Sequence, residues 1–298
     1  MKKLKHVLFL IIFIAAFLTT GCGKKEAAET GSAAGSSTVE AVTDTAESND
    51  GGQETVAETA GNTEEATPEP AEILVAAAAS LQNSMEEIGK LYRTENPDVT
   101  VTFTYGSSGT LQEQIEQGAP VDVFMSAALK QMTALEEKGL ILDGTKKELL
   151  ENKVVLIVPK DSDLGITSFE DILKASTIAL GDPESVPAGQ YAEEVFTSLN
   201  MLEDVKGKAN YGKDVTEVLT WVSTGNAEAG VVYATDAKSS DGVTVVAEAQ
   251  EGSTSKVIYP AAVVKDSKAA EAAKAFVEYL GSDEALGIFE KYGFTANK

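Results

Sequence analysis

Along most of this chain, short apolar runs alternate with stretches whose apolar residues recur at helical spacing, and the alternation begins near residue 72. The apolar runs predict strands at Ile73–Ala77, Val99–Tyr105, Val121–Ser126, Val154–Pro159, Thr177–Leu180, Ala229–Tyr233, Val243–Ala247 and Val257–Val264. The amphipathic stretches predict helices at Leu81–Glu95, Thr110–Gln117, Lys130–Lys138, Gln190–Leu199, Val215–Ser223, Ala269–Leu280 and Asp283–Tyr292. Strands separated by helices predict an α/β fold whose parallel sheets are covered on both faces.

The start of the chain has a different pattern. Three lysines within the first five residues precede an apolar run over residues 7–18, which is too short to span a bilayer comfortably. The run ends in Leu-Thr-Thr-Gly-Cys, which resembles a bacterial lipobox, although Thr19 stands where Leu is usual. This pattern predicts a lipoprotein signal peptide over residues 1–21 and a lipidated Cys22. The protein would then be anchored to the cell membrane and face the extracytoplasmic side.

Residues 22–71 form a second region of distinct composition. They are rich in Gly, Ala, Ser, Thr and Glu, and residues 26–72 hold 12 acidic side chains and no Lys or Arg. Such a segment cannot bury enough apolar surface to offset its conformational entropy. We therefore expect a disordered acidic tether between Cys22 and a globular part that begins at residue 72.

Composition narrows the chemistry of the mature chain. His6 is the only histidine and lies in the signal segment, and Cys22 is the only cysteine. With His6 removed and Cys22 lipidated, no imidazole or thiol remains for a catalytic triad, a proton shuttle or a zinc site. A Ser–Lys or Asp/Glu mechanism remains open to the residues present, but no Lys or carboxylate is marked by its setting, so we expect neither an enzyme nor a cofactor. Residues 73–298 hold 35 acidic and 19 basic side chains, a net charge of −16, which argues against nucleic acid or anionic lipid as a partner.

Three loops point to a small anion instead. Residues 77–80, 106–110 and 186–189 each follow a predicted strand and lead into a predicted helix. A helix N-terminus carries unpaired N–H groups and the positive end of the helix dipole, so it attracts anions. Ser80 is predicted as an N-cap, and Thr110–Glu113 and Asp214–Glu217 have the spacing of capping boxes.

The loops also carry a family resemblance. The segments that carry it are Ala-Ala-Ala-Ser-Leu at 77–81, Gly-Ser-Ser-Gly-Thr-Leu at 106–111, Gly-Ala-Pro-Val-Asp-Val-Phe at 118–124, Gly-Asp-Pro-Glu-Ser-Val-Pro-Ala-Gly at 181–189, Gly-Val-Val-Tyr at 230–233, Tyr-Pro at 259–260 and the C-terminal residues 289–294. In this order they resemble the periplasmic molybdate-binding protein of ABC uptake systems, over essentially all of 72–298. The resemblance implies a two-lobed, type II periplasmic-binding-protein-like fold with a hinge and an interlobe ligand cleft.

The resemblance also implies a set of ligand-binding residues. Ser80 and Ser108 would each offer a hydroxyl and a backbone N–H, Ala188 and Val215 a backbone N–H, and Tyr233 a phenolic O–H. The family often has a third serine where Gly109 stands, and we expect this departure to loosen the loop.

The same resemblance implies a division of the globular part. Lobe 1 would comprise 72–152 plus 239–298, and lobe 2 would comprise 153–238. The chain would cross between the lobes near Asn152–Val154 and Thr235–Ser239. Trp221, the only tryptophan, shares its helical face with valines and is predicted in the core rather than in the cleft.

The implied function is extracytoplasmic capture of molybdate, and of tungstate, by a monomer that delivers the oxyanion to an ABC permease. A site made of donors alone suits a fully deprotonated dianion, whereas phosphate keeps a proton for part of the time near its second pKa of about 6. A site without an acceptor would leave that proton unpaired, at a cost of about 1–3 kcal/mol. The alternatives are a receptor for tungstate alone or for sulfate, a surface hydrolase using Ser80 or Ser108, and a structural or adhesive lipoprotein.

Overall fold

A computed structural model describes residues 70–297 of the chain. The predicted signal peptide, Cys22 and all but the last residues of the predicted tether lie outside the described residues. Within 70–297, no helix combines the length and the apolar character needed to cross a bilayer.

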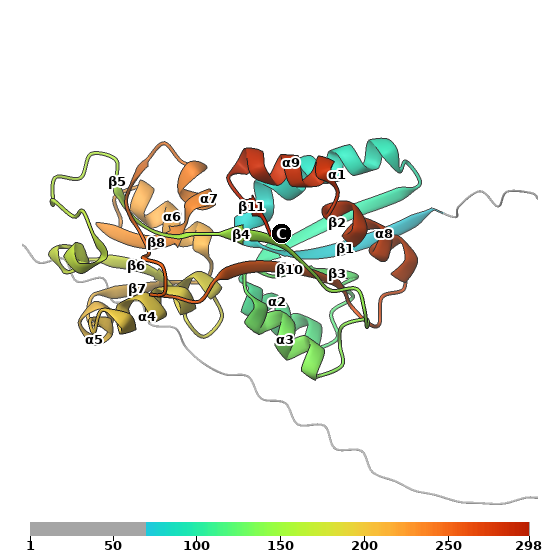
Figure 1. Ribbon diagram of the computed structural model, residues 1–298, viewed down its shortest axis with the longest axis horizontal. Helices are drawn as coiled ribbons and strands as arrows, with labels where there is room; N and C mark the ends of the chain where they lie inside the picture. Colours follow the sequence, from blue (N-terminus) through green and yellow to red (C-terminus); the bar gives the residue numbers. More distant parts are fainter. Residues whose placement is uncertain (1–69, 298) are drawn as a thin grey trace, which may run out of the picture. The chain divides into compact units, whose positions relative to one another are not determined.

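The first sheet has six strands in the order β11-β4-β10-β3-β1-β2. They are β1 (Ala71–Ala78), β2 (Val99–Gly106), β3 (Val123–Met125), β4 (Lys147–Asn152), β10 (Val257–Val263) and β11 (Thr295–Ala296). Its helices are α1 (Gln82–Glu95), α2 (Ser108–Glu116), α3 (Leu129–Glu137), α8 (Ala270–Leu280) and α9 (Asp283–Tyr292). Helices α2 and α3 lie on one face of the sheet and α1, α8 and α9 on the other (Figure 1). We call this part lobe 1.

The second sheet has five strands in the order β7-β6-β8-β5-β9. They are β5 (Val154–Pro159), β6 (Ile178–Gly181), β7 (Ala209–Gly212), β8 (Ala229–Tyr233) and β9 (Val243–Glu248). Its helices are α4 (Pro187–Ser198), α5 (Leu202–Lys206), α6 (Val215–Ser223) and α7 (Ala234–Lys238), with a 3-10 helix, η2 (Phe169–Lys174). We call this part lobe 2.

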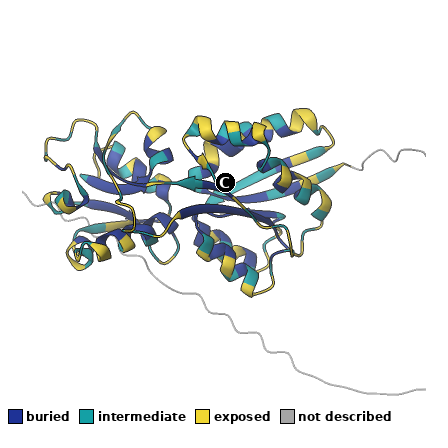
Figure 2. Cartoon of the chain, viewed as in Figure 1, coloured by how far each residue is buried: buried dark blue, intermediate teal, exposed yellow. Residues whose placement is uncertain are grey.

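The central strands of both sheets are buried on both faces. In β1, Ile73 and Val75 pack into one apolar cluster, whereas Ala76 packs into the cluster beneath α2 and α3. Strands β5, β8 and β10 are almost wholly buried, while exposed residues gather on the outer faces of the helices (Figure 2). The near-continuous apolar runs of the sequence are therefore explained by helices on both sides of each sheet.

The structure corrects two predictions about topology. The sheets are mixed rather than parallel, because β10 runs antiparallel to β3 and β4, and β5 runs antiparallel to β8 and β9. These antiparallel strands adjoin the points where the chain passes between the sheets. The first passage lies between β4 and β5, around Lys153. The second lies between β9 and β10, so the predicted boundary at 238/239 is too early: β9 pairs with β5 and belongs to lobe 2.

Candidate anion-binding site

The five predicted ligand-binding residues line one cavity between the two lobes. Ser80 and Ser108 enter it from lobe 1, and Ala188, Val215 and Tyr233 from lobe 2. The cavity encloses about 210 Å³ of space not filled by protein atoms, part of it open to solvent. Four of the five residues are at most 4% exposed, and Ser80 is half-buried. The fold thus brings together residues that are up to 153 positions apart in the sequence.

Helix α2 supplies Ser108 at its first position. Ser107 is the N-cap and its Oγ accepts from the Thr110 N–H at 3.1 Å. The predicted capping box at Thr110–Glu113 is therefore wrong, because α2 begins at Ser108, two residues before the predicted start at Thr110. Ser108 Oγ accepts the Ala127 N–H at 2.9 Å, which fixes the oxygen and leaves its own hydrogen free to be donated. No acceptor for the Ser108 N–H is found among the described residues.

Helix α4 supplies Ala188 at its second position, earlier than the predicted start at Gln190. Pro187 occupies the first position, where its missing N–H costs nothing. A Cβ on Gly189 would lie 2.0 Å from the Gly181 carbonyl oxygen, so only glycine lets α4 start this close to the end of β6. The Gly189 N–H donates to the Val186 carbonyl at 3.0 Å, whereas the Ala188 N–H has no acceptor among residues 70–297.

Helix α6 supplies Val215 at its first position, and here the predicted helix start is confirmed. Asp214 is the N-cap, and its Oδ1 accepts the Glu217 N–H at 2.9 Å. The Val215 N–H finds no acceptor in the described part of the chain. Asp214 also lines the cavity, so one carboxylate borders a set of donors that was predicted to contain none.

Ser80 is held in a different way from the one predicted. It lies in the short 3-10 helix η1 (Ala79–Leu81), and the N-cap of α1 is Leu81, without a side-chain cap. Its Oγ lies 2.9 Å from the Tyr259 Oη of β10, and that oxygen accepts a hydrogen bond from the Asn152 side-chain amide at 3.3 Å. Either hydroxyl can donate in the Ser80–Tyr259 hydrogen bond, and when Tyr259 donates, the Ser80 hydrogen is free for the cavity.

Tyr233 ends β8 and brings an unpaired hydroxyl to the site. The residue is 1% exposed, and its Oη has no hydrogen-bond partner among residues 70–297. Burial, reinforced by the neighbouring Tyr259, raises the pKa of Tyr233 well above its ordinary value, so the phenol stays protonated and can donate. A buried hydroxyl without a partner is costly, and a ligand oxygen would satisfy it.

Together these residues present four backbone N–H groups (Ser80, Ser108, Ala188 and Val215) and three hydroxyls (Ser80, Ser108 and Tyr233) to one small space. All are neutral donors, and three of the N–H groups belong to the first turns of helices α2, α4 and α6. Such an arrangement can bind a compact anion without a cationic side chain.

Gly109 does not loosen its loop as predicted. Ser107 caps the helix on one side of it, and the Gly109 N–H donates to the Ser185 carbonyl of lobe 2 at 2.8 Å. The loop is therefore fixed both within lobe 1 and across the cleft.

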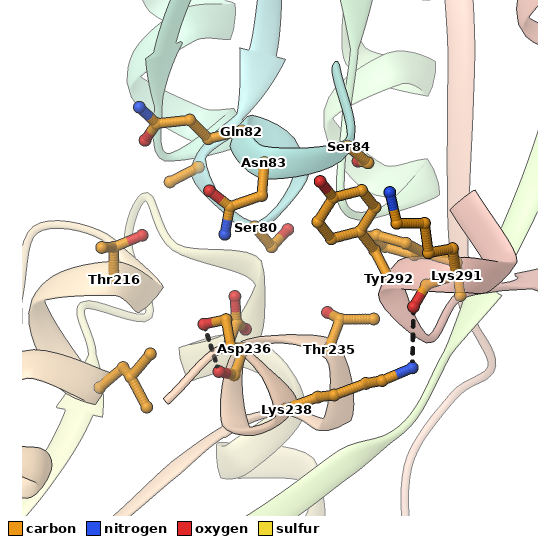
Figure 3. A pocket seen from close by; sticks show the side chains of 14 residues that line it. Ser80, Gln82, Asn83, Ser84, Thr216, Thr235, Asp236, Lys238, Lys291 and Tyr292 are labelled. Atoms are coloured by element: carbon orange, nitrogen blue, oxygen red, sulfur yellow. Dashed lines mark hydrogen bonds between the residues drawn. The ribbon is translucent and has the colours of Figure 1, made fainter. Parts of the chain in front are cut away.

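A larger space adjoins the cavity and shares Ala79 and Ser80 with it; we call it the vestibule (Figure 3). It encloses about 1110 Å³, including open solvent, and is bordered by the start of α1, by α6 and α7 and by the end of α9. Figure 3 shows Ser80 and Asn83 on one side, facing Thr235 and Asp236 on the other. Two lysines stand here: Lys238 donates to the Lys291 carbonyl at 2.9 Å, and Lys291 pairs with Glu87 at 2.6 Å.

The contacts that hold Ser80 could not be predicted from the sequence. The Tyr259 hydroxyl of β10 contacts Ser80, and Asn152 at the end of β4 donates to Tyr259 and, at 2.9 Å, to the Thr235 hydroxyl of α7. Trp221, predicted in the core, packs against it but also lines a cleft between the lobes together with Tyr105 of β2. Only the three-dimensional arrangement joins these positions.

Comparison with known proteins agrees with this geometry. The family model for bacterial extracellular solute-binding proteins matches residues 73–295. A Bacillus subtilis protein described as an ABC transporter substrate-binding lipoprotein is 49% identical over 224 residues, which is 75% of this chain and 86% of the relative. The molybdate-binding protein of Haemophilus influenzae is 42% identical over 231 residues, covering 76% and 91% of the two chains. A solved structure described as the substrate binding domain of a molybdenum ABC transporter from Clostridium difficile is 43% identical, with a TM-score of 0.61 and coverage of 76% of this chain and 100% of that one.

Proposed function

Because the chain belongs to the family of bacterial extracellular solute-binding proteins, we propose that it captures molybdate outside the cytoplasm and delivers it to an ABC permease. The single observation that carries this proposal is the cavity in which seven neutral donors from two lobes converge. Relatives that are 41–42% identical to this chain are molybdate-binding proteins, and they cover more than three quarters of it.

The ligand chemistry follows from the donors. A tetrahedral dianion such as molybdate has four oxygens that only accept hydrogen bonds, and the site offers hydrogens from several directions. The donors are neutral and lie in a water-poor space, where hydrogen bonds to an anion are stronger than in bulk water. Tungstate has the same charge and shape, so we propose that it binds as well. Hydrogen phosphate brings a proton that needs an acceptor, and the seven donors offer none. Asp214, which also lines the cavity, caps helix α6 by accepting the Glu217 N–H at one oxygen, so we propose that fully deprotonated dianions are preferred.

The neutral donors also explain how the anion can be released. A cationic side chain would hold the dianion even after the lobes separate, whereas backbone N–H groups split between two lobes hold it only when all converge. Opening the cleft parts Ser80 and Ser108 in lobe 1 from Ala188, Val215 and Tyr233 in lobe 2. A permease that opens the lobes would therefore lower the affinity for the anion.

We propose further that the protein acts as a monomer at the cell membrane, held by a lipid on Cys22 and needing no cofactor beyond its oxyanion. The signal-like first 21 residues and the Cys that follows them support the anchor. Mass spectrometry of the membrane fraction should find a lipid on Cys22, and Cys22→Ala should release the protein from the membrane. A chain that stays membrane-bound after this change would contradict the anchor and leave the binding function untouched.

The family comprises solute-binding proteins rather than enzymes, so the hydrolase alternative is not retained. The test of the proposed function is thermal unfolding of the full-length chain alone and with molybdate, tungstate, sulfate or phosphate. A ligand at 100 times its dissociation constant should add about 2.7 kcal/mol to the free energy of unfolding. We expect molybdate and tungstate to raise the midpoint and phosphate to leave it unchanged. A shift with sulfate alone would assign a sulfate receptor, and no shift with any of the four would reject an oxyanion site.

A further inference from the structure

The side-chain amide of Asn152 has a fixed orientation at the first passage between the lobes. Its Oδ1 accepts the N–H of Lys153, the next residue, at 2.9 Å. A backbone N–H can only donate, so this contact identifies the amide oxygen and turns Nδ2 toward two hydroxyls. Nδ2 donates to Thr235 Oγ1 of lobe 2 at 2.9 Å and to Tyr259 Oη of lobe 1 at 3.3 Å. Both hydroxyls therefore accept from Asn152.

The Tyr259 hydroxyl has two neighbours of different chemistry. The residue is 0% exposed, and burial, reinforced by Asp236, raises its pKa well above the ordinary value, so the phenol keeps its hydrogen. Asn152 presents only N–H hydrogens to this oxygen, whereas Ser80 Oγ, at 2.9 Å, can accept or donate. Among residues 70–297, Tyr259 Oη has no further partner. Ser80 is thus the one described acceptor for the Tyr259 hydrogen.

The amide of Asn152 decides which hydroxyl donates in the Ser80–Tyr259 hydrogen bond. If Ser80 donated, the Tyr259 hydrogen would be buried without an acceptor, which costs free energy. If Tyr259 donates, the hydrogen bonds run in one direction, from Asn152 to Tyr259 and from Tyr259 to Ser80. The Ser80 hydrogen is then left for the cavity that this residue lines. The second arrangement is favoured because every donor in it has an acceptor or faces the ligand.

We propose that Asn152 is a positioning residue for the anion site: its amide directs the Tyr259 hydrogen onto Ser80 Oγ and so turns the Ser80 hydrogen toward the bound oxyanion. Hydrogen bonds in such a chain polarise one another, which strengthens the last donor. The same amide holds Thr235 of lobe 2, which faces Ser80 across the vestibule (Figure 3). This inference rests on the proposed function, since it concerns one donor of the same cavity.

The test compares Asn152→Asp with Asn152→Ala in the full-length chain. A carboxylate can still accept the Lys153 N–H, but it also accepts the Tyr259 hydrogen, and Tyr259 would then take the hydrogen of Ser80. Alanine removes every contact of the amide and leaves Tyr259 able to donate to Ser80. We expect molybdate affinity, measured by calorimetry, to fall about tenfold or more in Asn152→Asp and less than about threefold in Asn152→Ala.

This order separates the direction of the hydrogen bonds from a merely structural role. If Asn152 served only to hold its neighbours in place, the variant that loses all its contacts would bind more weakly than the near-isosteric one. An affinity in Asn152→Ala as low as in Asn152→Asp, or lower, would overturn the proposal. An Asn152→Asp affinity within about twofold of wild type would overturn it as well.

A second background removes the effect of the added charge. Tyr259→Phe deletes the hydroxyl through which Asn152 acts, so in this background we expect Asn152→Asp to lower the affinity by about threefold at most. An equal loss in both backgrounds would assign the effect to charge and reject the inference. Asn226→Asp is the matched control, because the Asn226 amide also donates to a threonine hydroxyl, that of Thr224 at 2.9 Å, but lines neither the cavity nor the vestibule. Its affinity should stay within about twofold of wild type.

Binding by the wild-type chain separates this inference from the proposed function. If wild type binds molybdate and Asn152→Asp binds it equally well, the inference fails and the proposed function stands. A wild-type chain that binds none of the four oxyanions would reject the proposed function and this inference with it.

Discussion

The anion cavity and the vestibule share the Ala79–Ser80 turn, yet they are built on opposite principles. The cavity is small and lined by neutral donors, most of them buried, whereas the vestibule is about five times larger and bordered by the charged side chains Asp236, Lys238 and Lys291. Both lysines therefore border the vestibule, whereas the cavity is lined by uncharged N–H and O–H groups with one carboxylate, Asp214, at its border. The contrast indicates that affinity depends on donor geometry, while side-chain charge acts only on approach.

The largest effect should come from removing a donor of the cavity. Ser108→Ala deletes a hydroxyl aimed at the ligand, and a hydrogen bond to a charged group contributes about 1.5–3 kcal/mol. We expect molybdate affinity, measured by calorimetry, to fall by about ten- to hundredfold. Ser107→Ala is the control, because Ser107 caps α2 and should lower stability more than affinity. Equal losses of affinity in the two variants would remove Ser108 from the ligand set.

A second variant tests whether the Tyr233 hydroxyl donates to a ligand in the cavity. Tyr233→Phe removes a buried hydroxyl that has no partner in the described part of the chain, so we expect the free chain to be as stable as wild type or more stable, and molybdate affinity to fall about tenfold. Tyr279→Phe is the matched control, since the Tyr279 hydroxyl of α8 is also buried and unpaired but lies outside the cavity. Thermal midpoints and calorimetric affinities would be compared. Unchanged affinity in Tyr233→Phe would contradict the donor role of this phenol.

The stability of the protein should depend on pH through Asp236, which lines the vestibule and accepts the N–H of Tyr233 in the cavity lining. Burial raises the pKa of this carboxyl to about 7, although it accepts the Tyr233 N–H at 3.1 Å. An acid whose pKa is raised on folding gives stability that is complete below its unfolded pKa of about 3.8 and is lost as the pH rises through 7. At about 1.4 kcal/mol per pKa unit, the effect is on the order of a few kcal/mol.

The matching variant is Asp236→Asn, which can still accept the Tyr233 N–H but cannot ionise. Urea unfolding at pH 5 and pH 8 should show the variant gaining stability relative to wild type as the pH rises. Parallel pH dependence of the two chains would mean that Asp236 does not titrate in this window.

The smallest effect should come from the vestibule. Lys238→Gln removes a cation that borders the vestibule and is not among the residues that line the cavity, so we expect molybdate to associate two- to threefold more slowly at low salt, with little change in the dissociation rate. Stopped-flow fluorescence of Trp221 would measure both rates, and the difference should vanish at high salt. Lys274→Gln, which pairs only with Glu271 on the surface of α8, is the control. A tenfold loss of equilibrium affinity in Lys238→Gln would contradict the claim that charge in the vestibule acts only on approach of the ligand.

The sequence predicted elements well where local signals mark their ends. Helix α6 begins at Val215 and α9 at Asp283, as predicted, because Asp214 and Ser282 are capping residues. It missed β4, since Lys-Glu-Leu-Leu-Glu-Asn at 147–152 has no strand-like composition; its place beside β10 makes it a strand. Short β7 at the sheet edge was missed for a similar reason.

In the candidate site too, some features could be predicted from the sequence and others could not. The five positions were named through motifs shared with a known family, and the fold brings all five to one cavity. The contacts that hold them could not be predicted, since Ser80 and Tyr259 are 179 residues apart and no local pattern links them. The hydrogen bond from the Gly109 N–H to the Ser185 carbonyl was also hidden, because its acceptor lies in the other lobe.

The place of β10 has a consequence for biogenesis. This strand lies in the middle of the first sheet, between β3 and β4, but it comes from residues 257–263, near the end of the chain. The strands of the second sheet are continuous over residues 154–248. A chain that emerges N-terminus first can therefore assemble lobe 2 before lobe 1, whose earlier strands must wait with their apolar faces uncovered. We expect any helper that protects this protein during export to engage residues 71–152.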